Sequence, residues 1–432
     1  MESSPSTAPP NGTKGAAVKL ADSDFAADRR AHDVGSAVRD YLTRLRGGEL
    51  GALPALLGMG GLILLFWILR PETFLSSQNI ANLFTQALPV TILAMGLIFV
   101  LLLGEIDLSA GVTGGVCAAV MAKLMVDAEQ PWYVAVLAAL ATGLVIGGAI
   151  GWLVSVIRIP SFVVTLALFL GLQGVTLRLI GEGGTVPVRD DVVVALANKN
   201  MPIWAGWLLA VVCTAGYAAV QLGRWRRQHQ RNLAARPIQL VVGQVAVVGA
   251  ALLFGTFLLS RDRAPSPLIT VAGVPWGVLL VAVLFIIASF VLSRTPYGRH
   301  LYAVGGNAEA ARRAGINVTR LRMSVFMIAS TLAAVSGIVA ASRLNSVATA
   351  SGGGNELLFA VGAAVIGGTS LFGGKGKARD AILGGLVVSI IANGLGLLGA
   401  KAYLNMLITG GVLLLAASID ALARRQRSAS GR

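Results

Sequence analysis

Few residues in this sequence are of the types that bind metals or carry out nucleophilic chemistry. The three histidines, His32, His229 and His300, lie far apart in polar segments, and none pairs with another at a metal-ligand spacing. The GxSxG and HExxH patterns of serine hydrolases and zinc proteases do not occur. Cys117 and Cys213 lie inside separate apolar runs, so we expect buried free thiols and no disulfide. The sequence therefore predicts no metal centre and no enzyme active site.

One glycine-rich stretch, GGTSLFGGKGK at 367–377, superficially resembles a phosphate-binding loop. That loop requires a glycine five residues before its Gly-Lys pair, and Thr369 stands there instead. Gly376 also occupies the position at which Ser or Thr would bind magnesium. We therefore expect this chain to bind no nucleotide and no other cofactor.

The segment TPYGRHLYAVGGNAEAARRAGINVTRLR at 295–322 is a long polar and basic stretch between two apolar runs. Within it, the signals of a short helix follow in order: a capping residue, an acidic first turn, a basic last turn and a glycine able to adopt the left-handed conformation. These residues are Asn307, Glu309, Arg312, Arg313 and Gly315. The pattern predicts a two-turn helix over residues 308–314.

The side chains of that helix are mostly alanine, which gives it a narrow surface that could lie in a groove of another protein. Arg312 and Arg313 would be free to pair with acidic groups of such a partner. The alternative, a helix resting on anionic lipid, would carry Leu, Phe or Trp on one face, and the helix has none of these. We therefore interpret it as a docking site for a partner protein.

The rest of the chain is strongly apolar. Of its 432 residues, 55% are hydrophobic and 13% are charged, and the mean hydropathy is +0.76. These values exclude a soluble globular protein and indicate an integral membrane protein. The formal net charge is +15, but the Lys and Arg residues lie in short loops and tails, as the positive-inside rule requires. We expect lipid around the chain and no nucleic-acid partner.

Apolar stretches of about 17 to 25 residues, long enough to cross a bilayer, recur along the chain. We place spans at 52–69, 87–104, 109–126, 132–157, 160–180, 202–222, 238–259, 275–293, 323–342, 356–373, 381–399 and 404–421. The predicted fold class is an all-α polytopic membrane protein with about 12 transmembrane helices. The glycine-rich ends near 87–126 and 356–373 could be broken or re-entrant helices.

The basic loops set the predicted orientation. With both termini cytoplasmic, the basic segments fall on the inner side: 224–236, 295–322, 375–379 and 424–427. The segments at 127–130 and 182–191 fall outside, and RDR at 261–263 is the exception to the rule.

The composition divides the chain into three parts. Residues 1–48 are rich in Ser, Pro, Ala and mixed charge and predict a disordered cytoplasmic tail. Residues 49–422 form the transmembrane domain, and 423–432 form a basic cytoplasmic tail. The first apolar run is long enough to span, so we expect a signal anchor and no cleaved signal peptide. GEIDLSAG at 104–111 and GGTSLFGG at 367–374 echo each other weakly, which fits duplication or shared turn chemistry equally well.

Polar groups within or beside spans are costly, so they are candidates for a pathway across the membrane. Asp107 could line such a pathway or cap the next helix, and we favour the cap. For the uncharged polar residues, interhelical hydrogen bonding is the alternative. The pathway candidates are Asp107, Ser109, Phe162, Thr165, Gln173 and Asn393. Nearly all acidic residues lie in loops or at span ends, which argues against proton- or sodium-driven transport. It also argues against a cationic substrate and fits a neutral, hydroxyl-rich solute.

Several stretches resemble permease subunits of monosaccharide ABC importers, the family that handles ribose, xylose, arabinose and galactose. They are FLSSQNIANLFTQ at 74–86, GEIDLSAG at 104–111, IPSFVVTLALFLGLQG at 159–174, YGRHLYAVGGNAEAARRAGINVTR at 297–320 and AAVIGGTSLFGGKGKARDAILGG at 363–385. The insertion at 224–263 is similar to that of xylose-type members. Glu105 stands where many relatives carry glycine.

The resemblance implies an all-helical permease of the cell inner membrane that pairs with a second copy of itself or with a close homologue. Two ABC ATPase subunits would bind its cytoplasmic face and hydrolyse ATP, and an extracytoplasmic sugar-binding protein would deliver the substrate. The positions that would transmit ATPase closure are Gly306, Asn307, Glu309, Ala310, Arg312, Gly315 and Ile316, beside Arg313 from the helix pattern.

The sequence thus predicts a permease subunit for a neutral monosaccharide such as xylose. Two rival hypotheses remain at this point: a proton-coupled sugar carrier that works alone, and a membrane scaffold that only recruits a cytosolic partner.

Overall fold

The computed structural model describes residues 53–401, apart from 232–236 and 265–269, and isolated positions outside that range. The predicted tails at 1–48 and 423–432 therefore lie almost entirely outside the described residues, and the span at 404–421 is described only in part, chiefly at 406–412. The chain divides into two compact units. One comprises Met1–Thr43 and Cys213–Gly249, and the other comprises Arg44–Val212 and Ala250–Arg432. All candidate site residues belong to the second unit.

The described part of the chain is built almost entirely from helices. In chain order they are α2 (Leu53–Leu69), α3 (Ser77–Leu102), α4 (Ala110–Val126), α5 (Trp132–Trp152), η3 (Leu153–Ile157), α6 (Ser161–Ile180), α7 (Asp191–Asn198), α8 (Ile203–Gln230), α9 (Ile238–Ser260), α10 (Trp276–Arg294), α11 (Pro296–Gly306), α12 (Ala308–Arg313), α13 (Val318–Leu344), α14 (Glu356–Gly367) and α15 (Ala378–Leu397). Two short strands, β1 (Thr185–Pro187) and β2 (Ser346–Ala348), pair antiparallel with Val186 opposite Val347.

Each of the first eleven predicted spans overlaps one of these helices, although α3, α8 and α13 extend beyond the predicted bounds. Eight helices of the described part are long and apolar enough to cross a membrane, whereas α2, α4 and α14 are shorter. α14 has 12 residues, which extend about 18 Å at the rise of an α-helix and cannot cross a hydrocarbon core of about 30 Å. It ends where Gly368 adopts φ +119°. The predicted span at 356–373 is therefore wrong beyond residue 367, and the break that its glycines suggested is confirmed.

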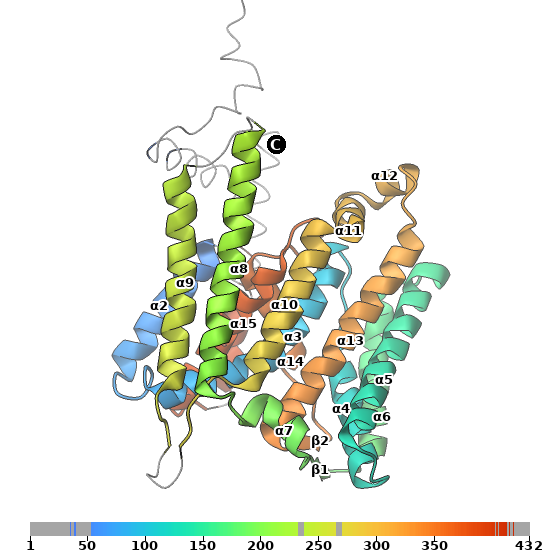
Figure 1. Ribbon diagram of the computed structural model, residues 1–432. Helices are drawn as coiled ribbons and strands as arrows, with labels where there is room; N and C mark the ends of the chain where they lie inside the picture. Colours follow the sequence, from blue (N-terminus) through green and yellow to red (C-terminus); the bar gives the residue numbers. More distant parts are fainter. Residues whose placement is uncertain are drawn as a thin grey trace, which may run out of the picture. The chain divides into compact units, whose positions relative to one another are not determined.

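Helix α13 forms the centre of the second unit and packs against α3, α4 and α5. Figure 1 shows α11 and α12 at one end of α13 and strands β1 and β2 at its other end. Phe326 is fully buried on α13, and its carbonyl lies against Gly147 of α5. Glycines allow these helices to touch through their backbones, because in lipid close packing replaces the hydrophobic effect as the force that holds helices together.

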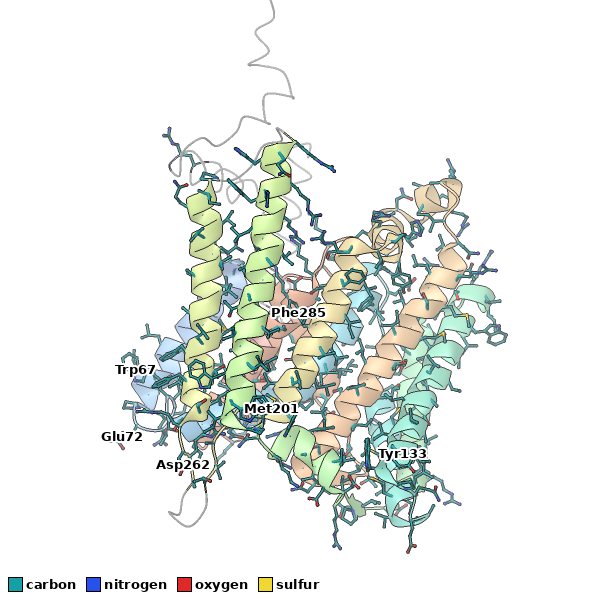
Figure 2. The ribbon with its side chains drawn as sticks, in the orientation of Figure 1. Trp67, Glu72, Tyr133, Met201, Asp262 and Phe285 are labelled. Carbon is teal, nitrogen blue, oxygen red and sulfur yellow. The ribbon has the colours of Figure 1, made fainter. Side chains whose placement is uncertain are left out.

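Large apolar side chains cover the outside of the second unit. Trp67 on α2 is 46% exposed and Tyr133 on α5 is 53% exposed (Figure 2). In water such a surface would aggregate, but in a bilayer it is the surface that lipid chains cover. The two cysteines are free, as the sequence predicted, but only Cys117 is buried, and Cys213 is half-buried.

In the first unit, α8 and α9 lie close together at a glycine. A Cβ at Gly249 of α9 would lie 2.8 Å from Cγ2 of Thr214 on α8.

The Gly337–Gly114 contact gives a test of this packing. A Cβ at Gly337 of α13 would overlap the carbonyl oxygen of Gly114 on α4. We expect Gly337→Ala to destabilise the protein by about 1–3 kcal/mol, the usual cost of overpacking, and to lower its Tm in detergent. Gly148→Ala is the matched control, because a Cβ there meets no atom within 4 Å. An equal Tm for both variants would contradict the packing described here.

Candidate coupling site and pathway residues

Helix α12 has the caps that its sequence predicted. The Asn307 side-chain oxygen accepts a hydrogen bond of 2.9 Å from the amide of Ala310. At the other end Gly315 has φ +85°, and the amides of Gly315 and Ile316 donate to the carbonyls of Arg312 and Ala311 at 3.0 and 3.1 Å. This pair of bonds is a Schellman motif, which satisfies carbonyls that the helix end leaves free. The helix covers Ala308–Arg313, with Ala314 as its C-cap, so the predicted helix is confirmed.

One side of α12 is exposed and the other is packed. Ala311 is 5% exposed, and Ile316 packs against the main hydrophobic core. The exposed positions among the predicted coupling residues are Gly306, Asn307, Glu309, Ala310, Arg312, Arg313 and Gly315. The expectation that both arginines are free is wrong for the chain alone, because Glu309 lies 3.5 Å from Arg312 and 3.4 Å from Arg313. Such exposed pairs contribute at most about 1 kcal/mol, so a partner's acidic groups can replace Glu309.

Helix α11 precedes α12 and was not predicted. Thr295 caps it by accepting from the amide of Gly298 at 3.2 Å, and Pro296 stands at its first position. Leu301 and Val304 are buried. The signal was present in the sequence, since a proline after a threonine cap and apolar residues three to four positions apart indicate an amphipathic helix. The polar stretch therefore contains two helices and the first turn of α13.

Helix α11 is held to the helix bundle by backbone contacts at a set of glycines, which we call the glycine junction: Gly104, Gly305, Gly373 and Gly374. The Gly374 amide donates to the carbonyl of Leu102, at the end of α3, at 2.9 Å. A Cβ on Gly305 would overlap that same carbonyl. Nearby, the Tyr302 hydroxyl donates to the carbonyl of Gly376 at 2.7 Å. Helix α11 is therefore in direct contact with the end of α3 and with the loop before α15.

The glycine junction also brings together the two segments whose sequences echo each other. A Cβ on Gly104 would lie 3.3 Å from the carbonyl oxygen of Phe372. In the stretch that resembles a phosphate-binding loop, the amides of Ser370, Gly374 and Lys377 donate to protein oxygens within 2.9 Å. Those amides hold the loop and are not directed at a phosphate.

Asp107 is 2% exposed and lies just before Ser109, the N-cap residue of α4. Its Oδ1 accepts from the amide of Ser109 at 2.9 Å and from the hydroxyl of Ser109 at 2.7 Å. Its Oδ2 has no hydrogen-bond partner among the described residues. Burial raises the pKa of Asp107, against the lowering effect of these bonds. The carboxylate thus accepts from the N-cap residue of α4 and not from a first-turn amide as we had favoured, and one oxygen remains available for another donor.

The structure brings four of the six pathway candidates to one place. The Thr165 hydroxyl donates to the carbonyl of Ser161 at 2.9 Å and lies 3.4 Å from the carbonyl of Ile106, next to Asp107 and Ser109. Phe162 is on the first turn of α6, 53% exposed. The remaining two candidates, Gln173 and Asn393, lie elsewhere.

The two outlying candidates belong to other contacts. Gln173 lies further along α6, beside Gly353, where a Cβ would be 3.7 Å from its side-chain nitrogen. Asn393 of α15 exchanges two hydrogen bonds of 2.9 Å with Asn79 of α3, and both residues are buried. The interhelical hydrogen bonding that we gave as the alternative is therefore present at Asn393.

One ion pair of this region could not have been found from spacing. Glu105 Oε1 lies 3.2 Å from Nε of Arg322, so the loop after α3 is linked to the first turn of α13. The nitrogen makes no hydrogen bond among the described residues, because the approach is off the N–H direction. The two residues are far apart in sequence and only the fold brings them together.

Known proteins similar to this chain are transport permeases. A family model described as branched-chain amino acid transport system / permease component matches residues 79–417. The xylose transport system permease protein XylH of Escherichia coli (strain K12) is 34% identical over 366 residues, which cover 84% of this chain and 90% of that protein. XylH of Haemophilus influenzae is 31% identical over 377 residues, covering 87% and 98% of the two chains. The ribose import permease protein RbsC of Escherichia coli (strain K12) is 32% identical over 382 residues, covering 88% and 96%.

No solved structure matches the chain. The matched proteins are permeases and not enzymes, and they align with nearly the whole transmembrane part of this chain. The resemblance stated from the sequence is confirmed, and the protein is a multi-pass protein of the inner membrane. The chain belongs to the family of branched-chain amino acid transport system permease components.

Proposed function

We propose that this chain is the transmembrane permease subunit of an ABC importer that moves a neutral monosaccharide, with xylose as the first candidate, into the cytoplasm. The observation that carries the proposal is helix α12, which is exposed, capped at both ends and joined through α11 to the ends of the spanning helices. A helix with this geometry suits docking of an ATPase subunit in trans. The relatives named for xylose and ribose support a sugar as the substrate.

The partners follow from this assignment. ATPase subunits would bind at the eight coupling positions Gly306, Asn307, Glu309, Ala310, Arg312, Arg313, Gly315 and Ile316. They would hydrolyse the ATP, and an extracytoplasmic sugar-binding protein would deliver the substrate to the opposite end. A second copy of this chain would complete the pathway, with lipid around the pair.

The α12 end of the second unit is assigned to the cytoplasm by charge. The basic loops of α11–α12 and of 373–379 lie at this end, and positive residues are retained on the cytoplasmic side. About 12 spans with both termini cytoplasmic are the topology consistent with this orientation.

In the proposed mechanism, closure of the ATPase pair displaces α12 and α11. The glycine junction passes this displacement to α3 and α15, and the helices change from outward opening to inward opening. Asp107, Ser109, Phe162 and Thr165 lie at the inner end of the pathway in this scheme. Gln173, further along α6, and Asn393, on α15, lie further from this inner end.

A branched-chain amino acid is the second candidate substrate, since the family description names it. Uptake of labelled xylose and labelled leucine by cells that carry the complete transporter distinguishes the two. Uptake of sugar by this chain alone, driven by a pH gradient, would instead support a self-contained carrier.

Reversal of charge on α12 tests the docking proposal. Arg312→Glu with Arg313→Glu places two carboxylates beside Glu309, so we expect loss of most ATPase co-purification and at least a tenfold fall in sugar uptake, about 1.4 kcal/mol of binding free energy. Arg189→Glu, beside β1 at the opposite end, is the control for co-purification. Undiminished recovery of the ATPase with the double variant would exclude α12 as the docking site.

A second variant separates docking from transmission. Gly305→Ala forces α11 away from Leu102 but leaves the exposed face of α12 unchanged. We expect the ATPase to co-purify normally while sugar-stimulated ATP hydrolysis and uptake fall together by about tenfold or more, since overpacking costs about 1–3 kcal/mol. Gly396→Ala, where a Cβ meets nothing within 4 Å, should behave as wild type. Normal coupling in Gly305→Ala would show that the glycine junction does not transmit the motion.

A further inference from the structure

A cavity of about 560 Å³ opens beside α12, between η3, the first turn of α6 and the segment that joins α12 to α13. Its charged lining residues are Glu105, Arg158, Arg312 and Arg322, so three positive charges face one negative charge. We call it the basic cavity. Hydroxyl groups of Ser161 and Thr319 also line it.

Two of the three arginines, Arg158 and Arg322, have side-chain N–H donors without a hydrogen-bond acceptor among the described residues. The Arg158 side chain makes no hydrogen bond or ion pair among the described residues. Its backbone amide donates to the carbonyl of Leu153, and its φ of +68° is a left-handed conformation that is strained for a residue with a Cβ. The Nε of Arg322 is buried without a hydrogen bond, although Glu105 lies 3.2 Å away. A buried N–H group without a hydrogen bond, such as this Nε, is costly unless an acceptor completes it.

The start of α6 adds to the positive potential of the basic cavity. The helix follows Pro160, which cannot cap it with a side chain, and Pro160 and Ser161 both line the cavity. The amides of Val163 and Val164 donate to the carbonyl of Pro160, which leaves the first two amides of this 20-residue helix without partners among the described residues. Free amides at a helix start bind oxygen atoms of anions.

The surface next to the cavity shows which kind of anion fits. Four apolar side chains beside its rim, on η3 and α6, are between 42 and 53% exposed: Val156, Ile157, Phe162 and Val163. A soluble anion would gain nothing from this apolar surface. A phospholipid would bind both the cavity and its apolar rim, since its phosphate matches the arginines and its acyl chains cover the apolar residues. The cavity also lies at the ends of spanning helices, the level at which lipid headgroups are found.

We propose that the basic cavity binds the phosphate of an anionic phospholipid of the cytoplasmic leaflet, with Arg158 and Arg322 as the charged donors. The assignment to that leaflet rests on the proposed function. The bound phosphate bridges the end of η3 to the first turn of α13, and so fixes the segment that follows the coupling helix.

The test is lipid retention by the purified full-length chain, without ATPase, in nanodiscs of mixed phosphatidylglycerol and phosphatidylcholine. We expect native mass spectrometry to find phosphatidylglycerol enriched on the wild-type protein. Arg158→Gly with Arg322→Gln should reduce that enrichment about fivefold for each arginine removed, the value of one basic residue near an anionic surface. Arg178→Gln with Arg189→Gln, which removes two positive charges at and beyond the other end of α6, is the charge-matched control and should retain the lipid.

Three results would overturn the proposal: undiminished enrichment in the double variant, displacement of the lipid by millimolar inorganic phosphate, or its displacement by added ATPase subunits. Displacement by phosphate would indicate that the cavity binds a soluble anion, and displacement by the ATPase would indicate that it is part of the ATPase-binding site. If the double variant fails to fold, Arg158→Gly alone carries the test, since glycine relieves the left-handed strain. Because no transport is measured, loss of lipid binding and failure of the importer assignment are separate outcomes.

Discussion

Close backbone contact at glycines is the constraint on which the coupling geometry depends. At the glycine junction the carbonyl of Leu102 accepts a hydrogen bond from Gly374 and lies against Gly305, so three segments far apart in the sequence share one contact. In lipid, helices are held by packing distance and by satisfied backbone groups, not by burial of apolar surface from water. A contact between backbones has no flexible side chain to absorb a displacement. Helix α11 is therefore well suited to move α3 and α15 together.

The arginines near α12 divide into two groups by their surroundings. Arg312 and Arg313 lie in exposed pairs with Glu309, which solvent weakens and a partner can replace. Arg158 and Arg322 lie outside those pairs and line the basic cavity, which Arg312 also borders and where an unmatched positive charge has a larger effect. The basic stretch at 295–322, with Arg158 beside it, thus borders two neighbouring surfaces: one that we propose for a protein partner and one that we propose for a lipid phosphate.

The polar residues of the pathway show how far sequence reasoning reaches. Asp107 and Ser109 are joined by local side-chain hydrogen bonds two residues apart, and local arrangements can be anticipated from neighbouring residues. The pairing of Asn393 with Asn79 could not be anticipated from the sequence, because each is an isolated polar residue in an apolar helix and many partners were available. Interhelical hydrogen bonding was the correct general alternative, but only the packing of α15 on α3 identified the partner.

The sequence by itself determined the membrane class, the location of eleven apolar helices and the capped helix α12. Each of these follows from hydrophobic runs or from residues within one turn of each other, and such effects act locally. The tertiary structure decided that α14 ends at Gly367, that Gly305 meets Leu102 and that Glu105 reaches Arg322. The contacts depend on distances between residues far apart in the chain. The end of α14 depends on which of several adjacent glycines adopts the left-handed conformation, and packing makes that choice.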